Sequence, residues 1–171
     1  MNREQVDQLL RDYLENKGRY EHLSTSIADA QIRLMGLQAE MRADIMFATA
    51  EQDGMPKPKG TVSRPTENMA VKLADGYETM DVSILKAQID RMRANMIQLG
   101  MCVAYVDAWL AGLTDREQWV VRNREIDKNS WPQMVDLFRE TFSSCGCSKD
   151  TLKRIRDHAM SKIYRIAMEE E

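Results

Sequence analysis

Residues 82–113 read VSILKAQIDRMRANMIQLGMCVAYVDAWLAGL, with apolar side chains at alternating intervals of three and four residues. The members of this stripe are Val82, Leu85, Ile89, Met92, Met96, Leu99, Val103, Val106, Leu110 and Leu113. Such spacing places a continuous apolar seam along one side of a supercoiled helix. Charged and polar residues such as Lys86, Asp90 and Arg93 fill the positions between them. The stretch therefore predicts one long helix that pairs with another helix.

A second stripe with the same spacing comes earlier in the chain. It consists of Tyr20, Leu23, Ile27, Ala30, Leu34, Leu37 and Met41, followed less regularly by Ile45 and Ala48. The two stripes can pair with each other as an antiparallel hairpin, or each can pair with another protomer, and the sequence does not choose between these. A glycine inside a helix costs about 1 kcal/mol relative to alanine. We therefore expect Gly18 to separate a short leading helix from the long one.

A loop is expected between the two long helices, over residues 51–64. Two prolines and two glycines between Asp53 and Gly60 cannot continue a helix. A short helix at 69–74 follows in the prediction. The fold class expected is all-α: a long helical, coiled-coil-like hairpin over residues 1–112, and a separate C-terminal domain over 113–171.

Composition narrows the class of protein. Charged residues make up 30% of the chain and aromatic residues only 6%, a balance that suits helices better than strands. No apolar run approaches the roughly 20 residues that span a bilayer, and no signal-peptide core is present, so we expect no membrane partner and a cytoplasmic location. Three cysteines and two histidines are too few for a disulfide framework or a convincing zinc site. We therefore expect no metal and no cofactor.

Three helix starts follow one another in the C-terminal part. Thr114 with Glu117, and Ser130 with Gln133, have the spacing of capping boxes. Ser148 begins the third helix, in which Leu152, Ile155, Ala159, Ile163 and Ile166 fall on one face. Between residues 148 and 166, six cations stand against two anions in a chain whose net charge is −3. A basic helix on an acidic protein suits docking on nucleic acid through one defined element.

These C-terminal residues resemble region 4 of bacterial sigma factors. The segment from Leu113 to Val121, LTDREQWVV, is similar to the opening of that region. The segment from Ser148 to Ile163 is similar to its recognition helix. The resemblance covers about 55 residues and implies a DNA-binding helix-turn-helix. The connection from Arg139 to Cys147 is about seven residues longer than the family has, which alters the turn between the last two helices.

The order of parts along the whole chain resembles the RinA/ArpU-type regulators of phages and prophages. Those proteins place a helix, a loop, a Ser…Thr-Glu-x-Met-Ala-Val segment, a long helix and a sigma-like domain in this order. Here that segment runs from Ser63 to Val71. The resemblance implies promoter binding and activation of late genes in the cytoplasm of a bacterial host cell. Double-stranded DNA is then the expected partner, and RNA polymerase and a second copy of the chain are further candidates.

The sigma pattern, carried over by position, assigns the DNA-contacting residues. It puts base contacts at Lys149, Asp150, Lys153 and Arg154, after the recognition serine Ser148. Lysine or arginine donates to guanine O6 and N7, and a carboxylate accepts from cytosine N4. The remaining two candidates, Thr151 and Lys162, are expected to hold the DNA backbone.

Two other classes of protein remain open, and enzymes are not among them. The sequence has no phosphate-binding Gly-x-x-x-x-Gly-Lys loop, no nucleophile elbow and no cluster of metal ligands. A DNA-packaging protein of the small-terminase kind also joins a helix-turn-helix to helical oligomerisation segments, and would form rings. A coiled-coil adaptor without DNA binding is the third class.

Overall fold

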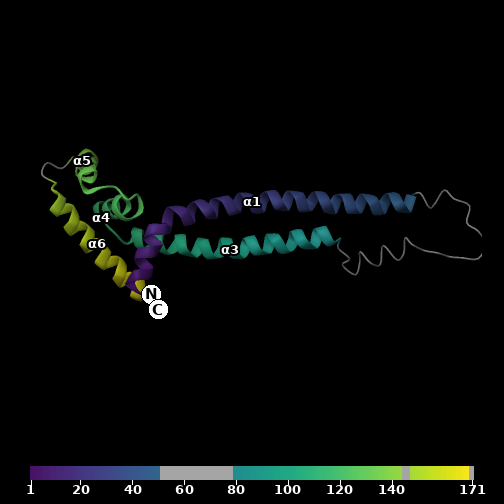
Figure 1. The fold of residues 1–171 in the computed structure, drawn as a ribbon, viewed down its shortest axis with the longest axis horizontal. Coiled ribbons are helices and arrows are strands. Elements are labelled where there is room, and N and C mark those ends of the chain that lie inside the picture. Colours follow the sequence, from purple (N-terminus) through teal and green to yellow (C-terminus); the bar gives the residue numbers. More distant parts are fainter. Residues whose placement is uncertain (51–78, 144–146, 170–171) are drawn as a thin grey trace, which may run out of the picture. The chain divides into compact units, whose positions relative to one another are not determined.

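The computed structural model describes residues 1–50, 79–143 and 147–169. Within these ranges the chain is all-helical, without a strand, so the all-α prediction is confirmed for this part of it (Figure 1). The helices are α1 (Arg3–Ala50), α3 (Met80–Ala111), α4 (Asp115–Val121), the π-helical turn η1 (Arg122–Ile126), α5 (Trp131–Phe142) and α6 (Lys149–Glu169). The predicted loop at 51–64, the short helix at 69–74 and the segment from Ser63 to Val71 lie outside the described residues.

The chain divides into two compact units that differ from the predicted domains. The first unit combines Met1–Glu21 with Ile97–Glu171, and the second is His22–Met96. Both long helices therefore contribute to both units. The N-terminal 21 residues, which the sequence placed with the helical arm, belong to the same unit as α4, α5 and α6.

In the second unit, α1 and α3 lie side by side and share one apolar cluster (Figure 1). Its buried members are Ile27, Ala30, Leu85 and Ile89, and Leu34, Leu37, Met92 and Met96 pack against them. Every one of these residues belongs to one of the two stripes identified in the sequence. The apolar periodicity thus predicted which side chains of each helix enter the cluster, and it left open whether the two stripes meet each other.

The predicted break at Gly18 is wrong, because α1 runs without interruption from Arg3 to Ala50. A Cβ placed on Gly18 would meet nothing within 4 Å. Buried residues lie on both sides of the glycine, with Tyr13 before it and Ile27 after it. Tertiary packing of this kind contributes more to helix stability than the roughly 1 kcal/mol that one glycine costs.

The first unit has a larger core, to which five elements contribute. The cluster comprises Val6, Leu10, Tyr13, Val106, Trp109, Leu110, Val121, Ile126, Ala159, Met160, Ile163 and Ala167. Two hydrogen bonds join its elements at the edge: Tyr164 donates to Asp7 Oδ1 at 2.7 Å, and Tyr13 donates to Asp107 Oδ1 at 2.7 Å. The start of α1 and the second half of α6 are therefore packed against each other in this unit.

A smaller core holds α4, α5 and the start of α6 together. Val120, Met134, Phe138, Cys147 and Leu152 are buried in it. Trp119 and Trp131 pack against this cluster, and Trp119 makes an edge-on contact with Phe138 at 5.3 Å between ring centroids. Trp119, Trp131 and Phe138 therefore all pack within this module.

The predicted helix starts are present. At α4, the Thr114 N–H donates to Glu117 Oε2 at 3.0 Å, and at α5 the Ser130 N–H donates to Gln133 Oε1 at 3.1 Å. Both are the return bonds of a capping box. At α6, the Thr151 N–H donates to Ser148 Oγ at 3.2 Å, as an N-cap serine is expected to accept. These caps fix where each helix of the C-terminal module begins.

Candidate nucleic-acid interface

The outward face of α6 carries the residues predicted to touch DNA bases. Lys149, Asp150, Lys153 and Arg154 are all exposed. Among the residues that the structure describes, none of these four side chains forms an ion pair. Their charged groups are therefore open to solvent on the first two turns of the helix.

The opposite face of α6 is fixed in the two cores of the first unit. Leu152, Ala159 and Ile163 are fully buried, as the sequence predicted. Ile155 and Ile166 are only partly buried, whereas Met160 and Ala167, which were not predicted, are buried. The helix therefore presents a charged side while its apolar side is held by packing.

Ser148 and Thr151 stand at the start of α6 and are exposed. Their hydroxyl oxygens lie 3.1 Å apart, and Ser148 Oγ also caps the helix. Each hydroxyl retains capacity for a further hydrogen bond, since a hydroxyl has one donor and two acceptor positions. Both are placed beside the exposed charges, so contact with a phosphate by Thr151 stays a prediction.

Lys162 lies apart from the other candidate residues. Its Nζ is 2.9 Å from Glu117 Oε2, and its side chain is only 28% exposed. The structure thus gives Lys162 an intramolecular carboxylate partner. A contact of Lys162 with the DNA backbone stays a prediction, and it would have to compete with Glu117.

Glu117 is the buried charged side chain of this module. The sequence predicted its capping bond at the start of α4 but not its bonds to α6. Besides capping α4, its carboxylate accepts from His158 Nδ1 at 2.7 Å and from Lys162 on α6. Burial by itself would raise the pKa of Glu117. Hydrogen bonds from the Thr114 N–H, Lys162, the Thr114 hydroxyl and His158 outweigh burial and lower this pKa to about 2. The capping-box spacing revealed the bond to Thr114, but nothing in the sequence pointed to His158 and Lys162.

A second ion pair joins α6 to the π-helical turn. Arg156 Nε donates to Glu125 Oε1 at 2.8 Å, and the two side chains are 34% and 18% exposed. Burial lowers the pKa of Arg156, but its bonds to Glu125 and Asp157 outweigh burial and raise it. Arg156, one of the cations counted along this helix, is therefore neutralised within the protein.

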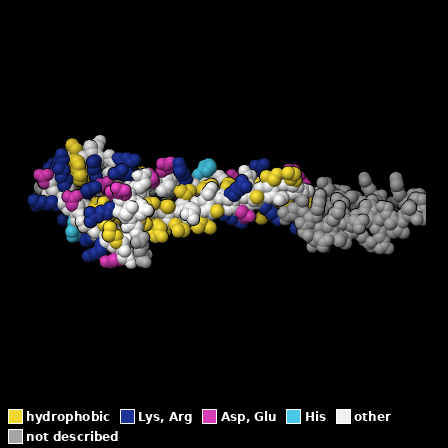
Figure 2. All heavy atoms as spheres, turned by 60° about the horizontal axis from the view of Figure 1, so that its bottom comes forward, with side chains coloured by type: hydrophobic (Ala, Val, Ile, Leu, Met, Phe, Trp, Pro, Cys, Tyr) yellow, Lys and Arg dark blue, Asp and Glu magenta, His cyan; other side chains and the backbone are white. Residues whose placement is uncertain are grey.

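Several further Lys and Arg side chains lie on α5 and α6. Figure 2 shows Lys and Arg side chains crowded over this part of the face in view. Arg139, near the end of α5, donates to the Cys147 carbonyl oxygen at 3.1 Å, lies 3.9 Å from Asp136 Oδ1 and is half-exposed. This bond crosses the connection between α5 and α6, whose residues 144–146, including Cys145, lie outside the described ranges. Arg139 thus adds a positive charge near the start of α6 that the sequence analysis did not single out.

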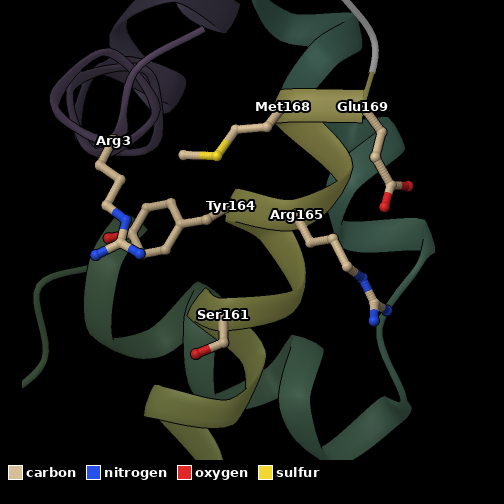
Figure 3. A pocket seen from close by; sticks show the side chains of 6 residues that line it. All are labelled: Arg3, Ser161, Tyr164, Arg165, Met168 and Glu169. Atoms are coloured by element: carbon tan, nitrogen blue, oxygen red, sulfur yellow. The ribbon is translucent and has the colours of Figure 1, made fainter.

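An open pocket of ≈ 390 Å³ lies on the second half of α6, beyond the first two turns that carry the predicted base-contacting residues. Arg3, Ser161, Tyr164, Arg165, Met168 and Glu169 line it. Figure 3 shows Arg3 beside Tyr164, with Arg165 and Glu169 on the other side of α6. The Arg3 guanidinium lies 5.3 Å from the centre of the Tyr164 ring. Since the charged groups do not converge on one point, this pocket has no built ligand site.

Two further features are absent from residues 1–50, 79–143 and 147–169. No group of three or more His, Cys, Asp and Glu side chains there could hold a metal ion. No helix there is long and apolar enough to cross a membrane.

Comparisons with protein-family models, curated proteins and solved structures find no match for this chain.

Proposed function

We propose that the chain is a sequence-specific DNA-binding regulator of phage or prophage type, in which α5 and α6 form a helix-turn-helix. In such a motif the second helix enters the major groove, and residues near its N-terminus contact base edges. The observation that carries the proposal is the division of α6 into two sides. Lys149, Asp150, Lys153 and Arg154 face solvent without ion-pair partners among the described residues, while Leu152, Ala159 and Ile163 are buried.

The chemistry of the exposed face suits base contacts. Lysine and arginine donate to guanine, an aspartate accepts from cytosine, and a good bidentate contact discriminates against a wrong base by about 1–3 kcal/mol. The half-exposed Arg139 and the exposed Thr151 lie near the start of α6 and suit phosphate contacts. Activation of late genes and contact with RNA polymerase rest on the resemblance to the RinA/ArpU-type regulators alone.

The test is binding of the full chain to intergenic DNA from the genome that encodes it, in a salt series with nonspecific competitor. We expect one fragment to bind more tightly than the others, with an affinity that falls linearly on a log–log plot against salt as phosphate contacts are lost. Equal binding of all fragments would contradict sequence-specific binding. If no fragment binds at low salt, the chain is better described as an adaptor without DNA binding.

The helical arm is proposed to be a coiled-coil hairpin that sets the number of subunits. In the second unit, Ile32, Met35, Met80 and Ile84 have exposed fractions between 55% and 78%, and such apolar side chains are candidates for contact with another copy. The solution mass of the chain separates two DNA-binding classes. A monomer or dimer supports a regulator, whereas a closed ring of many subunits supports a small-terminase-like packaging protein.

A further inference from the structure

Two carboxylates from neighbouring elements hold α6 at different points around its circumference. Glu117 of α4 binds His158 Nδ1 at 2.7 Å and Lys162 Nζ at 2.9 Å, and Glu125 of η1 binds Arg156 Nε at 2.8 Å. With 3.6 residues per turn, positions 156 and 162 are about 120° apart around a helix. The fully buried Leu152 and Ala159 lie between these two directions on the helix. The ion pairs therefore flank the apolar side of α6.

Hydrophobic attraction is itself non-directional, so the ion pairs are the directional contacts on this side of α6. A helix with its side chains has a radius of about 5–6 Å, so a rotation of about 20° moves a side-chain tip by about 2 Å. A hydrogen bond between charged groups tolerates only a few tenths of an ångström around about 2.8 Å. Contacts of this kind therefore add a directional restraint on the rotation of α6 to the packing of its buried side chains.

We infer that Glu117 is a positioning residue whose carboxylate fixes the rotation of α6 and thereby the base preference of its exposed face. The inference rests on the proposed function, since it concerns how well Lys153 and Arg154 align with base edges. Phosphate contacts depend far less on this alignment. A change at Glu117 should therefore reduce discrimination between DNA sequences while leaving general attraction to DNA in place.

The test compares Glu117→Gln with the wild-type full chain in binding to the preferred fragment and to competitor DNA. We expect affinity for the preferred fragment to fall at least about tenfold, the equivalent of one misaligned base contact. Affinity for competitor DNA should not fall, because the variant removes no phosphate-contacting cation and releases Lys162 from Glu117. Asp115→Asn is the matched control: it removes one negative charge from an exposed position on the same helix and should preserve the preference.

A second variant keeps the test decisive if Glu117→Gln loses helicity by circular dichroism. His158→Ala removes one of the two bonds from Glu117 to α6 at a position that is not assigned to DNA contact, so it should reduce the preference in the same direction. Unchanged preference in the folded variants would overturn the inference, as would a parallel loss of affinity for both DNAs. A wild-type chain with no preferred fragment would instead contradict the proposed function itself, so the two failures are distinguishable.

Discussion

The two units of the molecule are held together in different ways. In the second unit, one seam between α1 and α3 has four buried residues, and large apolar side chains such as Ile32 and Met35 are exposed at 68% and 69%. The first unit has two larger cores, and polar bonds at Glu117, Glu125 and Tyr164 cross between its elements. Both units are helical, and in the first unit apolar burial is combined with hydrogen bonds and ion pairs between its elements.

The different contacts in the two units are consistent with different roles in the proposed function. A seam of apolar side chains permits pairing with other helices, since burial of apolar surface has no strict geometry. A helix that contacts base edges must hold its side chains in fixed positions, and the buried carboxylate and the ion pairs around α6 provide this. The first unit therefore suits recognition, and the second suits association.

The largest expected effect is a loss of free energy of unfolding, and it should differ between the two units. Ile163→Ala, at a fully buried position of the first unit, should lower the free energy of unfolding by about 2–5 kcal/mol, because it leaves a cavity. Ile32→Ala, at a position exposed at 68% in the second unit, should change it by less than about 0.5 kcal/mol. Urea unfolding of both variants measures these values. A loss above about 1 kcal/mol at Ile32 would mean that another chain covers this residue.

A smaller effect on the free energy of unfolding should appear when the pH is lowered, because Glu117 then becomes protonated. The pKa of Glu117 is about 2 in the folded chain and about 4.3 when a glutamate is unfolded. Since the folded pKa is the lower one, its contribution to stability is complete above about pH 5 and is lost as the pH falls towards 2, up to about 3 kcal/mol. Glu117→Gln should therefore be less stable than wild type near neutral pH, and the difference should narrow towards about pH 3. Urea unfolding at several pH values checks this.

The control for this pH dependence is again Asp115→Asn, whose side chain is exposed on the same helix. Its stability should follow the wild-type pH curve. A constant difference between wild type and Glu117→Gln across the acid range would show that the carboxylate does not have the low pKa assigned to it.

The smallest effect concerns the continuous helix α1. Gly18→Ala should raise the free energy of unfolding by about 0.5–1 kcal/mol, because alanine favours the helix and nothing lies within 4 Å of the added Cβ. Gly112→Ala is the informative contrast, since its Cβ would meet Ile166 Cδ1 at 3.0 Å. Thermal unfolding compares the two, and destabilisation by Gly18→Ala would argue against an unbroken helix at that position.

The sequence predicted those features that depend on periodicity and local chemistry. The stripes anticipated the apolar cluster of the second unit, and the capping spacings located the starts of α4 and α5. The exposed positions Lys153 and Arg154 followed from helical geometry. Each of these features is set by residues a few positions apart, which is why a pattern was sufficient.

Features that depend on long-range packing were not predicted. Trp109 is fully buried although it lies outside the stripe, because the core it enters includes the start of α1 and the second half of α6. Tyr164 and Asp7 are 157 positions apart in the chain, and Glu117 and Lys162 are 45 apart. No local pattern relates residues at such separations, so the second role of Glu117 was not visible.

The most direct test of the central claim is a charge-matched pair of double variants in the DNA-binding assay. Lys153→Ala with Arg154→Ala removes two cations from the exposed face of α6, and Arg91→Ala with Arg93→Ala removes two from exposed positions on α3. We predict that the α6 variant loses about 2–6 kcal/mol of binding to the preferred fragment while keeping its helicity, and that the α3 variant binds as wild type does. Equal binding by both variants would contradict the claim that this face of α6 contacts DNA.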